Sequence, residues 1–205
     1  MQMDELVAAF PAQLRDAVRI GREISLKTPQ LPIRNVVVTG LGGSGIGGTM
    51  LTQLMESEIG VPLVVNKDYR LPAFVGAETL VIVSSYSGNT EETLSALKSA
   101  IASRAHIVCV CSGGTVAEMA REHNLDLILI PPGMPPRSCL GYSFVQLLFI
   151  LSALRLTGTS PADDLLACAD MLESEYAGIN AFSTTLALPW LTNYPSCILK
   201  HDMKE

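Results

Sequence analysis

The chain carries little charge, and this scarcity excludes several classes of protein. Only 17% of its 205 residues are charged, 48% are apolar, and the formal net charge is −6. A chain this apolar is expected to bury a sizeable core and not to be disordered. Nucleic-acid-binding proteins need clustered Lys and Arg, so the acidic balance predicts no nucleic-acid partner. A small anionic ligand remains open, because salt screens exposed charges beyond about 8 Å and local donors decide that question.

Long apolar segments are also missing. The longest apolar stretch, Phe144 to Leu154, is interrupted by Gln146 and Ser152, and a bilayer requires roughly 20 residues. The first ten residues include Asp4 and Glu5 and contain no apolar core segment, so no secretory signal is expected. We therefore expect a cytoplasmic protein with no membrane partner, and we interpret the stretch as a buried helix.

The cysteines follow no metal-binding or redox spacing. The five cysteines include no C-x-x-C pair. Cys109 and Cys111 lie two apart in an apolar run, which places both on one face of a strand. Their pattern favours buried, reduced thiols in a cytosolic protein.

Short apolar runs alternate with helical patterns along the middle of the chain. Most of the runs are continuously apolar, which is typical of a parallel sheet covered on both faces. The sequence therefore predicts an α/β fold with five parallel strands. The strands are expected at 35–39, 62–65, 79–84, 106–110 and 126–130, with helices at 46–57, 90–103 and 115–123.

Helices are also predicted on both sides of this repeating part. Apolar residues at helical spacing predict a helix from Asp4 to Ser25, in which Pro11 can separate the first turn. A proline-rich loop at 131–137 precedes an apolar helix at 141–156. A capped helix is expected at 160–176, with Ser160 as N-cap, and after Gly178 the pattern cannot be interpreted.

Three loops between strand and helix are rich in glycine, serine and threonine. They are 40–45, 84–90 and 111–115. The carboxyl ends of parallel strands meet at one edge of a sheet, where ligands bind. Glycine lets backbone N–H groups approach an anion, and the following helix N-terminus adds unpaired donors and partial positive charge. Two such loops have enough donors for a phosphate monoester without any lysine.

The first loop contains G-x-G-x-x-G twice, starting at Gly40 and at Gly43. This short motif suggests a dinucleotide site, which needs an acidic residue about 20 positions later at the end of the second strand. The candidate, Asp68, follows Asn66 and Lys67 beyond the expected strand end. No G-K-[ST] follows the glycines, so the P-loop pattern is absent. The glycines can also serve only a tight turn and close helix packing.

The second loop is more specific. Ser84, Ser85, Ser87 and Thr90 place four hydroxyl groups within seven residues, directly after an apolar strand. A role of Ser87 or Asn89 as a helix N-cap would explain one polar residue. It would not explain four hydroxyls together, so we interpret this loop as an anion-binding segment.

These loops resemble a known family. The stretches 41–48 and 85–93, together with Pro136-Arg137 and 140–142, resemble the sugar isomerase (SIS) domain. In detail they resemble the amino-terminal half of the bifunctional phosphoglucose/phosphomannose isomerases, from about Asp4 to about Tyr176. The resemblance implies a three-layer αβα sandwich with a five-stranded parallel sheet, of the flavodoxin-like doubly wound type. SIS domains usually pair, so it also implies a homodimer.

The resemblance carries site residues and a reaction to this sequence. The family interconverts glucose 6-phosphate or mannose 6-phosphate with fructose 6-phosphate by proton transfer between C1 and C2, without metal or cofactor. Arg137 is expected to steady the enediolate as the catalytic residue. The phosphate-binding residues implied are Gly43, Ser44, Ser85, Ser87 and Thr90.

The family's catalytic base, a ring-opening histidine and a lysine come from a second SIS domain and the dimer partner. We recognise no such domain in the residues after Tyr176, and His201 and Glu205 lie in a charged tail that we interpret as a solvated end. No base is therefore assigned. The expected organisation is an N-terminal helix and linker at 1–32, an SIS phosphosugar-binding domain at 33–158, and a C-terminal helix and tail at 159–205.

Two other functions remain open. One is a non-catalytic SIS sensor domain that binds a sugar phosphate and regulates a partner. The other is a Rossmann nucleotide-binding protein. The serine-rich loop separates the isomerase and the sensor from the nucleotide-binding protein, and turnover of fructose 6-phosphate separates the isomerase from the sensor.

Overall fold

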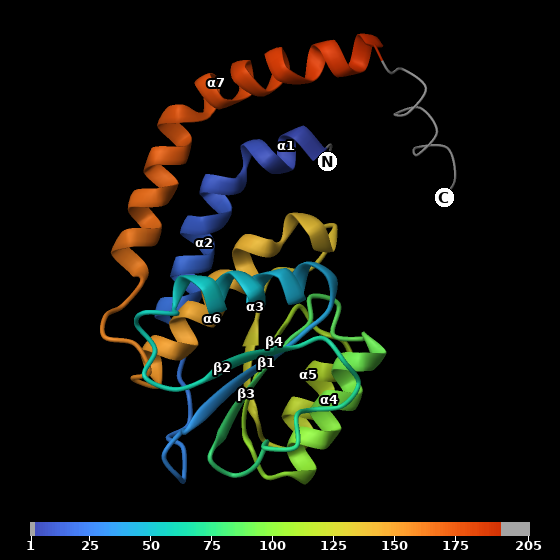
Figure 1. The fold of residues 1–205 in the computed structure, drawn as a ribbon, viewed down its shortest axis with the longest axis vertical. Helices are drawn as coiled ribbons and strands as arrows, with labels where there is room; N and C mark the ends of the chain where they lie inside the picture. The colour runs from blue at the N-terminus through green and yellow to red at the C-terminus, as the bar shows by residue number, and fades with distance from the viewer. Residues whose placement is uncertain (1–2, 194–205) are drawn as a thin grey trace.

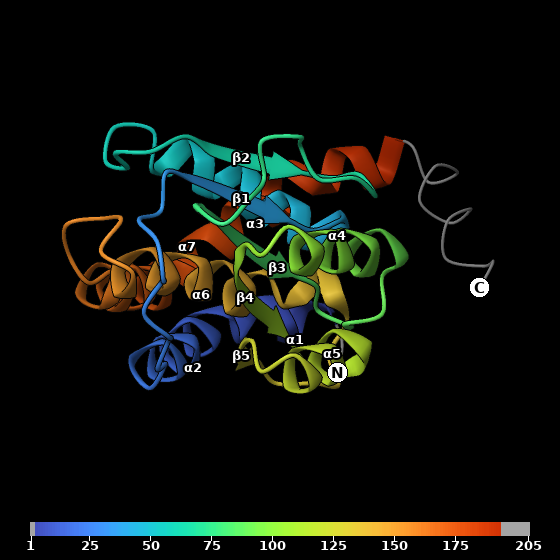
Figure 2. The same cartoon turned by 90° about the horizontal axis from the view of Figure 1, so that it is seen from below.

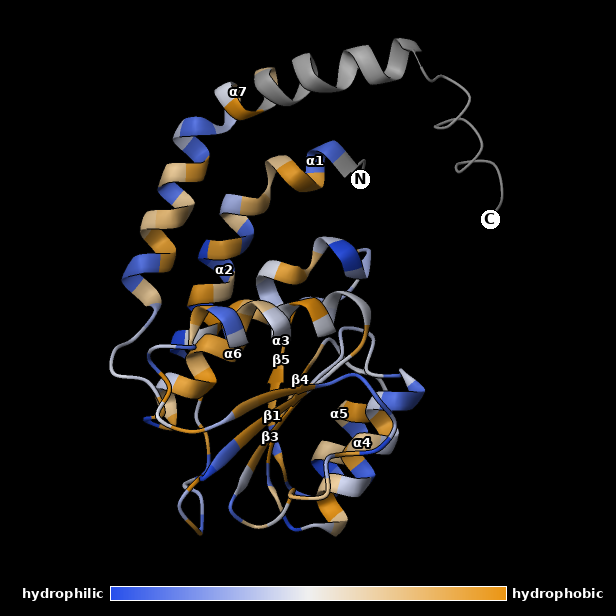
Figure 3. Ribbon diagram, in the orientation of Figure 1, coloured by the Kyte–Doolittle hydropathy of each residue, from blue (hydrophilic) through white to orange (hydrophobic). Residues whose placement is uncertain are grey.

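The computed structural model describes residues 3–193, and its described side chains are those of 4–179 and of Ala181. A five-stranded sheet lies between two sets of helices, and the polypeptide forms three layers (Figures 1 and 2). The strands are mostly apolar and lie between the helices that cover the two faces of the sheet (Figure 3). The three-layer α/β fold expected from the sequence is therefore confirmed.

All five strands are parallel and follow the order β2-β1-β3-β4-β5. This is the flavodoxin-like order, in which the winding reverses between β1 and β3 and a ligand crevice opens at their carboxyl ends. The predicted strands agree with the observed ones within one residue at each end. The strands are β1 (Asn35–Thr39), β2 (Leu63–Asn66), β3 (Thr79–Ser84), β4 (His106–Cys111) and β5 (Asp126–Leu129).

Side chains alternate between the two faces of the sheet, and each face has its own helices. Val36 and Val38 face α2 (Phe10–Arg22), α3 (Gly42–Leu54) and α6 (Leu140–Ala153). Val37 faces α4 (Glu91–Ala102) and α5 (Gly114–Glu122), as do Cys109 and Cys111. Cys109 is a buried free thiol, as expected from the sequence, and burial raises its pKa to about 12.

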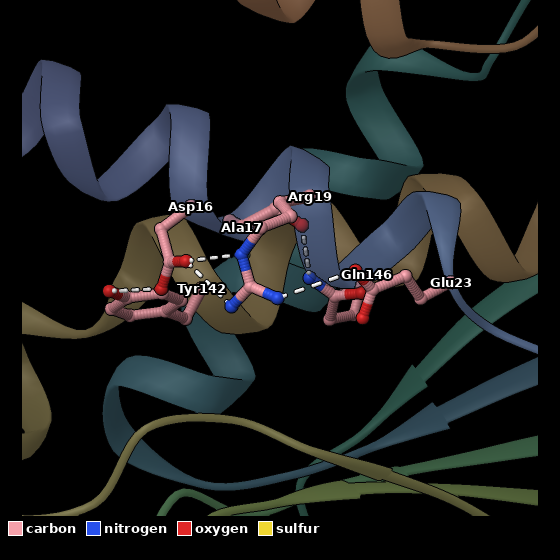
Figure 4. A network of polar contacts seen from close by, with 6 residues as sticks. All are labelled: Asp16, Ala17, Arg19, Glu23, Tyr142 and Gln146. Carbon is pink, nitrogen blue, oxygen red and sulfur yellow. Dashed lines mark hydrogen bonds and ion pairs between the residues drawn. The ribbon is translucent and has the colours of Figure 1, made fainter.

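Hydrogen bonds fix α2 against α6 (Figure 4). The amide of Gln146 is buried and donates to the Ala17 carbonyl oxygen over 2.9 Å. The Tyr142 hydroxyl donates to Asp16 over 3.0 Å, and burial together with that bond raises the pKa of Tyr142 to about 12. The two helices pack so closely that a Cβ atom on Gly21 would lie 2.2 Å from the Phe149 ring.

The predicted N-terminal helix is divided at Ala9 into α1 (Met3–Ala8) and α2, with Pro11 in the first turn of α2, so the separation anticipated at Pro11 is observed. Two other helical predictions need correction. Helix α3 begins four residues earlier than predicted and ends at Leu54. The last helix, α7 (Ala162–Asn193), was expected to end near Tyr176 but continues through Gly178. A single glycine costs a helix only about 1 kcal/mol, so it does not end one by itself.

Helix α7 packs along α2 on the outside of the molecule (Figure 1). Arg15 of α2 forms an ion pair with Asp170 of α7 over 2.8 Å. Among residues 3–193, no helix combines the length and the hydropathy that crossing a bilayer requires.

Candidate functional site

The loops that follow β1 and β3 end side by side at the carboxyl edge of the sheet. Thr39 pairs with Val83 in the register of β1 and β3, so Gly40 and Ser84 lie at the same level. A Cβ atom on Gly40 would lie 2.6 Å from the carbonyl oxygen of Ser84. The first and second loops of the sequence analysis are thus neighbours at the reversal point of the sheet, where an α/β fold binds its ligand.

The serine loop between β3 and α4 brings two of the predicted phosphate ligands together. The hydroxyl oxygens of Ser85 and Thr90 lie 3.3 Å apart. Ser87 is exposed, and its Oγ accepts the Asn89 N–H over 3.3 Å. Gly88 has a φ of +69°, which bends the loop back toward the sheet. The loop therefore presents hydroxyl groups around the N-terminus of α4.

The third loop is hydrogen-bonded to the serine loop. Ser112 Oγ donates to the Tyr86 carbonyl oxygen over 2.6 Å. The backbone N–H and the hydroxyl of Thr115 both donate to Asn89 Oδ1, over 3.0 and 3.1 Å. These bonds join the third loop to the serine loop and hold the serine loop in shape.

Gly43 and Ser44 lie in the first turn of α3, not in a loop before it. Leu41 is the N-cap residue and makes no side-chain capping bond, and the first turn contains no acidic residue. The first N–H groups of a helix have no intrahelical partner, so this terminus offers backbone donors at the carboxyl edge. A Cβ on Gly45 would lie 2.8 Å from the Gly40 carbonyl oxygen, so packing alone requires a glycine there.

The proline-rich loop is held next to both of these segments. The Tyr86 hydroxyl donates to the Pro131 carbonyl oxygen and accepts the Met134 N–H, each over 3.0 Å. Burial raises the pKa of Tyr86, so the hydroxyl stays protonated and able to donate. The Pro136 carbonyl oxygen is 3.7 Å from the position of a Cβ on Gly43.

Arg137 lies on this loop, in a short 3-10 turn (Pro136–Ser138), and is exposed. It makes no hydrogen bond or ion pair with any residue whose side chain is described. It borders a mostly apolar cavity of about 540 Å³ together with Phe10, Tyr176 and Ile179. The structure thus brings the backbone of this loop to the phosphate-binding segments, while Arg137 itself faces a cavity bounded by α1, α2 and α7.

Lys67 was not identified from the sequence as a site residue. It follows β2, and its Cε is 3.4 Å from the position of a Cβ on Gly45, in the first turn of α3. The neighbouring Asp68, considered above as the acidic residue of a dinucleotide site, lies beyond the strand end, and its carboxylate accepts the Tyr69 N–H over 2.6 Å. The sequence did contain one indication of this role. Lys67 comes directly after β2, and β2 pairs with β1, the strand that precedes the glycine loop.

The histidines with described positions lie away from this edge. His106 begins β4 at the opposite edge of the sheet, and His123 follows the end of α5, as their sequence positions suggested. His201 and Glu205 lie outside the described residues. Within the described part of the chain, no group of three or more His, Cys, Asp or Glu is placed to hold a metal ion.

No protein-family model matches the chain. A bifunctional phosphoglucose/phosphomannose isomerase of Caldicellulosiruptor bescii is 47% identical over 162 residues, which is 79% of this chain and 47% of that protein. The chain is a homologue of the bifunctional phosphoglucose/phosphomannose isomerases. A D-glucosamine-6-phosphate 4-epimerase of Sulfolobus acidocaldarius is 32% identical over 171 residues, 82% of this chain and 51% of that one. The chain spans about half the length of the curated relatives it matches.

A solved structure supports the fold independently. The C-terminal domain of a glucosamine-fructose-6-phosphate aminotransferase from Francisella tularensis superposes with a TM-score of 0.65 at 17% identity, covering 89% of this chain and 56% of that one. At this identity the likeness concerns the fold alone. The resemblance to the SIS phosphosugar isomerases inferred from the loops is confirmed by the relatives and by the sheet topology.

Proposed function

We propose that the chain binds a sugar phosphate and forms the phosphosugar-binding part of an aldose–ketose isomerase. The observation that carries the proposal is the pairing of the Ser85 and Thr90 hydroxyls beside the uncapped first turn of α3. Both segments lie at the reversal point of a parallel sheet. In this proposal residues 33–158 are the binding domain.

A phosphate monoester has several acceptor oxygens and needs many donors. The Ser44 and Ser87 hydroxyls, the Ser85–Thr90 pair and the N–H groups near Gly43 supply them. A hydrogen bond to a charged group contributes about 1.5–3 kcal/mol, so four or five such bonds are ample for specific binding.

The reaction we propose interconverts glucose 6-phosphate or mannose 6-phosphate with fructose 6-phosphate. A proton moves between C1 and C2 through an enediolate, and this chemistry needs no metal or cofactor. Arg137 is the proposed cation for the enediolate, because its loop adjoins Gly43 and its guanidinium has no partner among the described side chains. A positive charge held where negative charge develops is an effective way to stabilise such an intermediate.

We also propose a homodimer that acts in the cytoplasm. The apolar cavity beside Arg137 includes exposed Val7 and Ile179, and surfaces of this kind often mark association sites. The free thiols of Cys109, Cys111 and Cys139 are compatible with a reducing compartment.

A non-catalytic sensor is the second candidate. Turnover of fructose 6-phosphate to glucose or mannose 6-phosphate would support the isomerase, and binding of the same compound without turnover would support the sensor.

A thermal-shift screen tests the proposed function against nucleotide binding. A ligand that binds only the folded state raises the melting temperature, by about 2.7 kcal/mol of stabilisation at a hundredfold excess over the Kd. We expect fructose, glucose and mannose 6-phosphates to stabilise the chain, and NAD and NADP to have no effect. Stabilisation by the nicotinamide nucleotides alone would overturn the proposal.

A further inference from the structure

The segment after β2 crosses from one phosphate-binding segment to the other. The Cε of Lys67 packs 3.4 Å from the Cβ position of Gly45 in the first turn of α3. Two residues later, the Tyr69 hydroxyl lies 3.4 Å from Oε2 of Glu91, the first residue of α4. Residues 67–69 therefore connect the N-termini of the two helices that the proposed phosphate site uses.

The backbone around Lys67 is fixed by its neighbour. Asn66 is 7% exposed, and its Nδ2 donates to the Thr39 hydroxyl over 3.3 Å and to the Asp68 carbonyl oxygen over 2.8 Å. These bonds tie the residues on both sides of Lys67 to the end of β1. The lysine thus projects from a defined turn at the carboxyl edge.

The positive charge of Lys67 has no partner of opposite charge among the described side chains. Its ammonium makes no hydrogen bond or ion pair with any residue whose side chain is described, although Glu91 and Glu92 are close to Tyr69. It also lies beside a helix N-terminus, which carries partial positive charge and is an unfavourable position for a cation. The first turn of α3 contains no acidic residue that would offset this repulsion. An anion bound at the turn would remove the repulsion and give the ammonium a partner.

We propose that Lys67 supplies the positive charge of the sugar-phosphate site and makes it selective for the phosphate dianion. Strands lie about 4.8 Å apart, so the ends of β2 and β3 are about 10 Å apart. The extended lysine side chain and the phosphate group together span this distance. The inference rests on the proposed function, because it assigns a further residue to the same site.

The experiment is a calorimetric titration of fructose 6-phosphate into the 205-residue chain and two variants, Lys67→Gln and Lys98→Gln. Lys98 is exposed on α4, more than one turn from the serine loop, and its variant removes the same charge elsewhere. We expect Lys67→Gln to weaken binding about three- to tenfold, the range for a partly exposed charged contact, and Lys98→Gln to leave it unchanged. Both lysines are exposed, so neither variant should destabilise the fold, and Lys67→Gln should melt at or slightly above the wild-type temperature because it removes the repulsion from the N-terminus of α3.

The pH dependence provides a second measurement. The second pKa of a phosphate monoester is about 6, so the wild-type affinity should rise between pH 5 and 7.5 as the dianion forms. The rise should be smaller in Lys67→Gln. Equal affinity of wild type and Lys67→Gln, while Ser87→Ala binds more weakly, would overturn the role of Lys67 and leave the site intact. Absence of binding to the wild-type chain would overturn the proposed function and this inference together.

Discussion

At the scale of single residues, the hydroxyl groups of the second and third loops have two different tasks. Ser112 and Thr115 hold the loop from the neighbouring turn, whereas Ser85, Ser87 and Thr90 surround the N-terminus of α4. A hydroxyl that faces solvent in the free protein can donate to an anion without breaking an internal bond. Ser87 is the most exposed of the three and is the position where this idea is easiest to test.

Replacing Ser87 by Ala should weaken the binding of fructose 6-phosphate about ten- to hundredfold, because one hydrogen bond to a charged group contributes roughly 1.5–3 kcal/mol. Calorimetry gives the Kd, and Ser57→Ala, on an exposed site after α3, is the matched control. An unchanged Kd in Ser87→Ala would remove this hydroxyl from the site.

His106 should make the stability of the protein depend on pH. Burial lowers its pKa, an effect that outweighs the attraction of Asp126 and is reinforced by Lys27. In the unfolded chain His106 has its ordinary pKa of about 6.5, so below this pH the unfolded chain binds the proton more readily than the folded protein does. Stability that is present at neutral pH is therefore lost as the pH falls through the folded pKa of His106. Urea unfolding at pH 7.5 and 5.5 should show a larger loss for wild type than for His106→Asn. Parallel losses in the two proteins would contradict this assignment.

The serine loop could be located from the sequence because its four hydroxyl groups fall within seven residues directly after an apolar strand. Lys67 could not, because its approach to Gly45 depends on the pairing of β2 with β1 and on the turn fixed by Asn66. For Arg137 the sequence indicated the loop, but the orientation toward the cavity depends on α1 and α7, which pack from distant parts of the chain.

At the scale of the elements, glycines decide how closely the loops and helices approach the sheet. A Cβ on Gly48 would lie 3.1 Å from Val38 and 3.2 Å from Val65. Glycine has a poor helix propensity, and this is why the sequence predicted a loop where α3 begins. Tertiary packing overrides the propensity, because only glycine lets the first turns of α3 contact β1 and β2 directly.

Gly88, in the serine loop, should tolerate substitution poorly. It has a φ of +69°, and a Cβ there would lie 1.9 Å from the Gly113 carbonyl oxygen. Gly133 has a φ of +88° and open space around it, so Gly133→Ala carries only the backbone cost. We expect Gly88→Ala to lower the free energy of unfolding by about 2 kcal/mol more than Gly133→Ala does, because it adds a steric overlap. Urea unfolding measures both losses. Equal losses of unfolding free energy in the two variants would show that the third loop, which contains Gly113, moves to relieve the overlap and would contradict the prediction.

The long apolar strands could be located from the sequence because a strand buried on both faces is continuously apolar. Helix ends were less predictable. The break at Ala9 lies next to Pro11, which had indicated it, whereas the extension of α7 past Gly178 goes with its packing along α2, which local sequence does not encode.

At the scale of the whole molecule, the sheet order places the two donor-rich segments at its reversal point, and helices α1, α2 and α7 border an apolar cavity beside Arg137. Such a cavity favours self-association. We expect light scattering at micromolar concentration to give the mass of a dimer of the 21.9 kDa chain. Introducing a charge with Ile179→Glu should shift the equilibrium toward the monomer, and Leu54→Glu, an exposed apolar position on α3, is the control. A strictly monomeric wild type would contradict the prediction.

The central claim is that the carboxyl edge recognises the phosphate group of a sugar phosphate. Titration of the 205-residue chain with fructose 6-phosphate and, separately, with fructose tests it most directly. Most of the proposed donors are directed at the phosphate, and each charged hydrogen bond changes affinity about tenfold or more. We predict saturable binding of fructose 6-phosphate and no measurable binding of fructose at the same concentrations. Equal affinity for the two compounds, or no binding of fructose 6-phosphate, would contradict the account.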